Sequence, residues 1–188
     1  KYYSLAANGG SDKTKYSASI SYLNTEGIIK TSGLERYSLN MNVNQKLSDR
    51  IKAGFNINSG YTLRSGVVTS STNNSQGRAG VVTSATLFSP VQPIRNSSND
   101  ETEATLGIFY DANGRMISNQ NGDISNPTII LEENKNNGMT FEGRFNTFFE
   151  FKIIEGLFFK TSIRGYASNT KNKAYFSENI GWSRNVGG

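Results

Sequence analysis

The sequence predicts an all-β protein that is part of a transmembrane antiparallel β-barrel, and three observations lead to this prediction. Apolar and polar residues alternate with period two over several segments of the chain. These segments run for roughly 10 residues or more, enough for a strand tilted by about 45° to cross a bilayer. The connections between them are alternately short and long, as in outer-membrane barrels.

The alternation predicts about six strands. It is clearest in residues 36–44, where Tyr37, Leu39, Met41 and Val43 occupy every second position and polar residues fill the others. A helix would need apolar residues three and four positions apart, which this window does not supply. We expect four strands in residues 1–63 and two more in residues 140–169.

The connections predict two kinds of loop. The turns at residues 9–13, 47–50 and 154–156 are tight. Residues 64–139 contain all three prolines and several Asn/Ser/Gly clusters, and we expect them to form one long extracellular loop. Residues 170–188 are expected to begin the next extracellular loop, all within one incomplete barrel domain.

The two faces of these strands predict two environments. The apolar face, with aromatic residues at the strand ends, suits lipid and its interfacial aromatic girdles. The polar face suits a water-filled lumen, and a soluble β-sandwich is the alternative that alternation leaves open. Six strands cannot close a barrel, since the smallest need about 8, so we expect an internal piece of a larger one. The residues expected to face the lumen are Asn40, Asn42, Asn56, Asn58, Arg144 and Arg164, and the sequence does not identify which residues bind a substrate.

The composition argues against several functions. The chain has no cysteine and no histidine, which removes thiolate nucleophiles, Cys/His zinc sites and the commonest general base. The net charge is +5, but no run gathers five basic residues, so we expect no nucleic-acid partner. The start of the chain has no signal peptide, and there is no apolar stretch of 18 residues. We expect that the protein is not an enzyme and that it has no catalytic residues, no metal and no cofactor.

Three patterns in the first strands resemble a known family. Residues 8–16 contain Gly-Gly followed by Lys13 and Tyr16, residues 21–29 contain Tyr22 with Glu26-Gly27, and residues 35–42 contain Arg-Tyr-Ser. In this order and at this spacing they resemble the SusC/RagA family of TonB-dependent outer-membrane transporters. The loop around residues 88–93, 111–114 and 126–127, and the turn at 154–157, are similar to the same family.

The resemblance implies a plugged barrel of 22 strands in the outer membrane of a Gram-negative, Bacteroidetes-like bacterium. Such proteins import oligosaccharides or peptides with energy relayed by TonB, through a region absent from this chain. They work with a SusD-like surface lipoprotein that covers the barrel. Contact with this lipoprotein is expected at Phe88, Pro90 and Pro93 of the long loop. The alternatives are a passive porin, or a SusC-like barrel that serves as a scaffold in a larger envelope complex.

Overall fold

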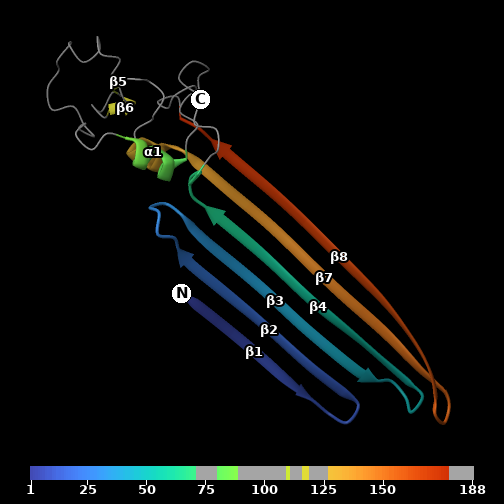
Figure 1. Ribbon diagram of the computed structural model, residues 1–188. Helices are drawn as coiled ribbons and strands as arrows, with labels where there is room; N and C mark the ends of the chain where they lie inside the picture. The colour runs from blue at the N-terminus through green and yellow to red at the C-terminus, as the bar shows by residue number, and fades with distance from the viewer. Residues whose placement is uncertain (71–79, 89–108, 111–115, 119–126, 178–188) are drawn as a thin grey trace. The chain divides into compact units, whose positions relative to one another are not determined.

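Six long strands form one antiparallel sheet in the computed structural model, which describes residues 1–70, 80–88, 109–110, 116–118 and 127–177. The strand order is β1-β2-β3-β4-β7-β8, so each strand pairs with the next long strand along the chain (Figure 1). This confirms the predicted order of antiparallel neighbours. The strands are β1 (Tyr2–Gly10), β2 (Thr14–Glu26), β3 (Gly33–Lys46), β4 (Ile51–Ser65), β7 (Lys135–Ile154) and β8 (Leu157–Tyr175).

The register of the strands keeps like residues on one face of the sheet. Ile20 of β2 is opposite Leu5 of β1 and Leu39 of β3. Farther along the sheet, Ile57 of β4 is opposite Phe145 of β7. Because side chains alternate between faces, a shift of one residue would exchange the apolar and polar faces throughout. The observed pairing preserves the alternation that the sequence predicts.

Tight turns join the strands in pairs at one end of the sheet, the lower right in Figure 1. In the β3–β4 turn, the Ser48 hydroxyl accepts a hydrogen bond from the Ile51 N–H at 3.1 Å. Asp49 in the same turn lies 2.6 Å from Lys46 Nζ, and this hydrogen bond and charge lower the pKa of the carboxyl. Gly156 closes the β7–β8 turn with φ +83°, which favours glycine. The three turns lie where the sequence predicts them.

The strands extend farther than the alternation suggests. Strand β7 begins at Lys135 rather than at residue 140, and β8 continues to Tyr175 rather than ending at 169. The backbone ladder continues, with Arg64 paired to Gly138, and Thr140 Oγ1 lies 3.4 Å from Thr170 Oγ1. Main-chain hydrogen bonds do not require an apolar side chain, so polar segments extend the strands without a periodic signal.

A second compact unit comprises residues 27–32, 65–137 and 172–188. Its described residues include α1 (Val81–Leu87), α3 (Pro127–Glu133) and the short pair β5 (Phe109–Tyr110) and β6 (Met116–Ser118). Neither helix is long and apolar enough to cross a membrane. We call this second unit the loop unit. Its core consists of Val67, Val81, Ile129 and Ile130, with Ile29 and Leu131 packed against it.

The sheet has a different character from the loop unit. All the buried apolar residues of the described chain lie in the loop unit, whereas Leu5 and Ile163 of the sheet are 69% and 67% exposed. Strands β1 and β8 form its two edges. A sheet with both faces uncovered and both edges unpaired is not a stable arrangement in water. The apolar face of the sheet therefore needs a covering that the described residues do not supply.

Candidate functional site

The six residues expected to face the lumen lie on the same face of the sheet. Asn58 is opposite Arg144, and Asn56 is opposite Asn146. Arg164 Nε donates a hydrogen bond to Asn146 Oδ1 at 3.3 Å. On β3, Asn40 and Asn42 are opposite Ser19 and Ser17 of β2. We call this the polar face.

A hollow of about 300 Å³ on the polar face brings three of these residues together. Asn40, Asn58 and Arg144 line it, together with Arg36 and Glu142. Asn42, Asn56 and Arg164 share the face but do not line this hollow. We refer to it as the Arg36–Arg144 hollow.

Side chains that the sequence analysis did not single out complete this site. Arg36 Nε donates to Thr62 Oγ1 at 3.2 Å, which fixes the guanidinium across β3 and β4. The Arg144 guanidinium carbon lies 5.4 Å from the centroid of the Tyr166 ring, a cation–π arrangement. The Tyr166 hydroxyl donates to Glu142 Oε1 at 3.3 Å. Period two indicates that Arg36, Glu142 and Tyr166 share the polar face, but it does not identify their neighbours.

The chemistry of the Arg36–Arg144 hollow is that of recognition. Guanidinium and amide N–H groups donate hydrogen bonds, and amide and carboxylate oxygens accept them. A polyhydroxylated or peptide ligand presents both donors and acceptors and can match such a surface. Among the described residues, no group of three or more Asp and Glu is placed to hold a metal ion.

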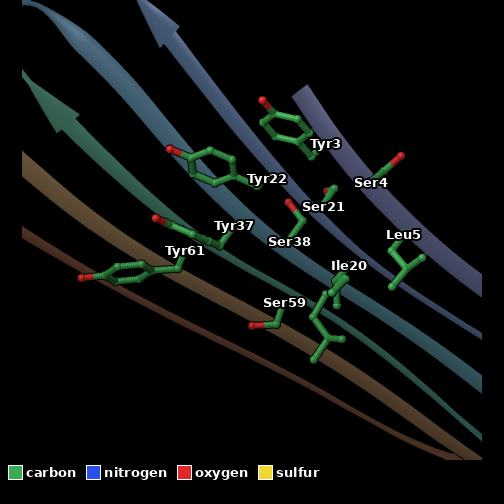
Figure 2. A pocket seen from close by; sticks show the side chains of 11 residues that line it. Tyr3, Ser4, Leu5, Ile20, Ser21, Tyr22, Tyr37, Ser38, Ser59 and Tyr61 are labelled. Carbon is green, nitrogen blue, oxygen red and sulfur yellow. The ribbon is translucent and has the colours of Figure 1, made fainter. Parts of the chain in front are cut away.

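The opposite, apolar face carries a row of tyrosines, one from each of four neighbouring strands (Figure 2). The rings of Tyr3 and Tyr22 are stacked, with centroids 6.4 Å apart and planes at 12°. Those of Tyr22 and Tyr37 are 5.0 Å apart and tilted by 42°. Tyr61 of β4 completes this tyrosine row, which lines a broad concavity of about 560 Å³ together with Leu5, Ile20 and Leu39.

The hydroxyl groups of the tyrosine row point toward one end of the sheet. Tyr22 accepts a hydrogen bond from Asn24 Nδ2 at 3.1 Å, and Tyr37 donates one to Glu35 Oε2 at 3.3 Å. Asn24 and Glu35 lie closer than the tyrosines to the connection at residues 27–32. The rings thus have polar atoms on one side and aliphatic side chains on the other. This orientation is typical of tyrosine at a membrane–water interface.

Comparison with known proteins identifies homologues of the chain. No protein-family model matches the chain. TonB-dependent receptor P3 of Formosa agariphila is 31% identical over 185 residues, which are 98% of this chain and 17% of that receptor. The chain is a homologue of TonB-dependent receptors. TonB-dependent receptor SusC of Bacteroides thetaiotaomicron is 25% identical over 97% of the chain and 19% of the receptor. TonB-dependent receptor P26 of Formosa agariphila is 42% identical over 57 residues, which are 30% of the chain and 6% of the receptor.

These relatives confirm the resemblance to SusC and bear on location. TonB-dependent receptors reside in the outer membrane of Gram-negative bacteria, so the expected location is confirmed. The names of the relatives describe receptors and not enzymes, in agreement with the expectation that the present chain is not an enzyme. The present chain spans less than a fifth of the length of receptors P3 and SusC.

The residues expected to contact a lipoprotein lie in the loop unit or outside the described residues. Phe88 follows α1, is partly buried, and its N–H donates to the Ser84 carbonyl at 2.8 Å. Pro90 and Pro93 lie outside the described residues. On α1, Leu87 is 51% exposed, whereas Val81 is buried in the core of the loop unit. The helix therefore presents an apolar side chain to its surroundings.

Proposed function

We propose that the chain forms part of the barrel wall of a TonB-dependent importer for oligosaccharides or peptides, within a barrel of 22 strands. The observation that carries this proposal is the two-faced open sheet in a homologue of TonB-dependent receptors. One face is apolar and ends in the tyrosine row, and the other holds the Arg36–Arg144 hollow. A barrel wall needs both surfaces, lipid-facing outside and polar inside.

The proposed orientation follows from the same features. The tyrosine row would lie at one membrane interface, with Leu5, Ile20 and Leu39 directed toward the hydrocarbon. The tight turns lie at the opposite end of the sheet, where outer-membrane barrels have their periplasmic turns. In this orientation the connections at 27–32 and 66–134 are extracellular. The polar face then lines the lumen, with Asn40, Asn42, Asn56, Asn58, Arg144 and Arg164 available to substrate.

Two protein partners belong to the proposal. The similarity to a receptor named SusC supports a SusD-like surface lipoprotein and TonB as partners. Exposed Leu87 and partly buried Phe88 are the described residues that we assign to the lipoprotein contact. TonB would act through a part of the receptor outside this chain.

Substrate uptake by the full-length receptor tests the site. Arg144→Gln removes the cation that faces Asn58 across the Arg36–Arg144 hollow. A hydrogen bond to a charged group contributes about 1.5–3 kcal/mol, so we expect the concentration for half-maximal uptake to rise by about tenfold or more. The matched control is Arg50→Gln, an exposed arginine in the β3–β4 turn that does not line the hollow, which should change uptake much less. Equal losses in the two variants would argue against the hollow as the binding site.

Dependence on TonB separates the importer from a passive porin. Deleting TonB should abolish uptake through an energised importer and leave diffusion through a porin unchanged. A scaffold would show no uptake in either strain. The readout is accumulation of labelled oligosaccharide or peptide in cells that carry the full-length receptor.

Lipoprotein association tests the partner assignment. Leu87→Asp places a charge on the exposed side of α1 without altering the core of the loop unit. We expect co-purification of the SusD-like lipoprotein to fall severalfold, since a buried unpaired charge at an interface is costly. Ala85→Asp, also exposed on α1, is the control for a charge on this helix. Normal recovery of the lipoprotein with Leu87→Asp would contradict the assignment.

A further inference from the structure

Two arginines of the Arg36–Arg144 hollow keep their charge without a carboxylate partner. Arg36 Nε donates to Thr62 Oγ1 at 3.2 Å, and its Nη groups form no hydrogen bond with a residue that the structure describes. The Arg144 guanidinium lies against the Tyr166 ring, which orients the cation but does not neutralise it. Neither arginine forms an ion pair with a described residue. Both cations are therefore positioned and available to a ligand.

The hollow has a net positive charge. Among the described residues that line it, Glu142 is the only acid. Its Oε1 accepts the hydrogen bond from the Tyr166 hydroxyl at 3.3 Å, and it forms an ion pair with neither arginine. A guanidinium group presents a planar set of N–H donors that can bind two oxygens of one anionic group. The unpaired cations therefore favour a ligand with oxyanions.

The rest of the polar face has charge of the same sign. By the alternation of side chains, the described strands place nine Lys or Arg residues and two Glu residues on this face. The acidic residues are Glu142 and Glu150. The basic residues are Lys15, Arg36, Lys46, Lys52, Arg64, Arg144, Lys152, Lys160 and Arg164. A wall with charge of one sign raises the local concentration of ligands of the opposite sign.

The uncharged lining of the hollow favours a sugar over a peptide. Ser21, Ser38, Asn40 and Asn58 line it, and among the described residues no aliphatic or aromatic side chain does so. Hydroxyl and amide groups both donate and accept hydrogen bonds, as sugar hydroxyls do. Peptide-binding surfaces usually offer pockets for apolar side chains. The volume of about 300 Å³ is at the lower end of the range for ligand pockets, so we assign the hollow to one charged unit of a longer oligomer.

We infer that the substrate is an acidic oligosaccharide, one that carries carboxylate or sulfate groups, and that Arg36 and Arg144 bind its oxyanions. The inference rests on the proposed importer function and narrows its substrate class. The serine and asparagine side chains of the hollow then bind the sugar hydroxyls. A neutral oligosaccharide would leave both guanidinium groups without an anionic partner.

Binding of matched oligosaccharides to the purified full-length receptor tests this inference. The panel contains uronic-acid oligosaccharides and their methyl esters, sulfated oligosaccharides and their desulfated forms, and acidic peptides of the same net charge. We expect an acidic oligosaccharide to bind and its neutralised form to bind about tenfold more weakly or worse, the effect of a lost hydrogen bond to a charged group. The ester and desulfated pairs distinguish carboxylate from sulfate. Binding of the acidic form should weaken with added salt, which screens the charges.

Variants of the receptor give effects of opposite sign. Arg36→Gln should weaken binding of the acidic form by about tenfold or more and leave the neutralised form unchanged. Arg36→Lys keeps the cation without the planar donors, so it should retain part of the binding. Glu142→Gln removes the one negative charge among the described lining residues, and its amide oxygen can still accept from the Tyr166 hydroxyl. We expect it to strengthen binding of the acidic form severalfold, because a repulsive charge is lost.

Several outcomes would overturn the inference. Equal or tighter binding of the neutralised forms, a preference for the acidic peptides, no binding of any acidic oligosaccharide, or weaker binding after Glu142→Gln would each do so. Uptake of the same panel by cells with and without TonB separates this inference from the proposed function. TonB-dependent uptake of neutral oligosaccharides or of peptides defeats the inference alone. A receptor that shows no TonB-dependent uptake of any panel member defeats the proposed function and this inference together.

Discussion

Met41→Arg should destabilise the assembled receptor by about 2–4 kcal/mol, the cost of an arginine on the lipid face near the bilayer midplane. Met41 is opposite Ala18 on the apolar face. It lies four residues along β3 from Tyr37 of the tyrosine row, which is about 10 Å of depth for a tilted strand. The apolar band of such barrels is about 25 Å tall, so Met41 is close to its centre.

The neighbouring residue supplies the control. Asn42→Arg introduces the same side chain one position away, on the polar face opposite Ser17. We expect it to change the free energy of unfolding by less than about 0.5 kcal/mol, as for other substitutions exposed to water. Equilibrium unfolding of the full-length receptor in lipid vesicles measures both variants. Equal destabilisation would contradict the assignment of the two faces.

Ile129→Ala should have the second large effect, but on the loop unit alone. Ile129 is fully buried against Val67, Val81 and Ile130. Removing a buried isoleucine side chain costs about 2–5 kcal/mol through lost burial and the cavity left behind. We expect the free energy of local opening, measured by hydrogen exchange in residues 127–137, to fall by this amount.

A matched variant and a second readout make this prediction specific. Leu87→Ala removes an aliphatic side chain of the same size from a position that is 51% exposed, so opening should change by about 0.5 kcal/mol or less. The heat-induced mobility shift of the barrel should stay normal in both variants, because Ile129 has no part in the paired strands. Similar effects of Ile129→Ala and Leu87→Ala would contradict the assigned core.

The same variant bears on the side of the membrane. If the loop unit is extracellular, protease added to whole cells should cleave it faster after Ile129→Ala, once the lipoprotein is absent. Complete protection in those cells would contradict the extracellular assignment of residues 66–134.

Local patterns in the sequence predict which segments are strands, which residues share a face and where the tight turns lie. Tyr37, Leu39 and Met41 reveal a strand because side chains alternate across a sheet with period two. Serine, glycine and aspartate reveal the turns because their local hydrogen bonds and backbone freedom favour them there. Both signals depend only on residues close together in the chain.

Which polar side chains meet depends on how the strands pair in three dimensions. Period two assigns Arg36, Asn58, Arg144 and Tyr166 to one face, but the register between strands determines that Asn58 is opposite Arg144. The core of the loop unit likewise joins Val67 to Ile129, in segments far apart in the sequence. Such contacts depend on register and chain path, which no local pattern encodes. For the same reason the strand ends at Lys135 and Tyr175, formed by backbone pairing of polar segments, carry no periodic signal.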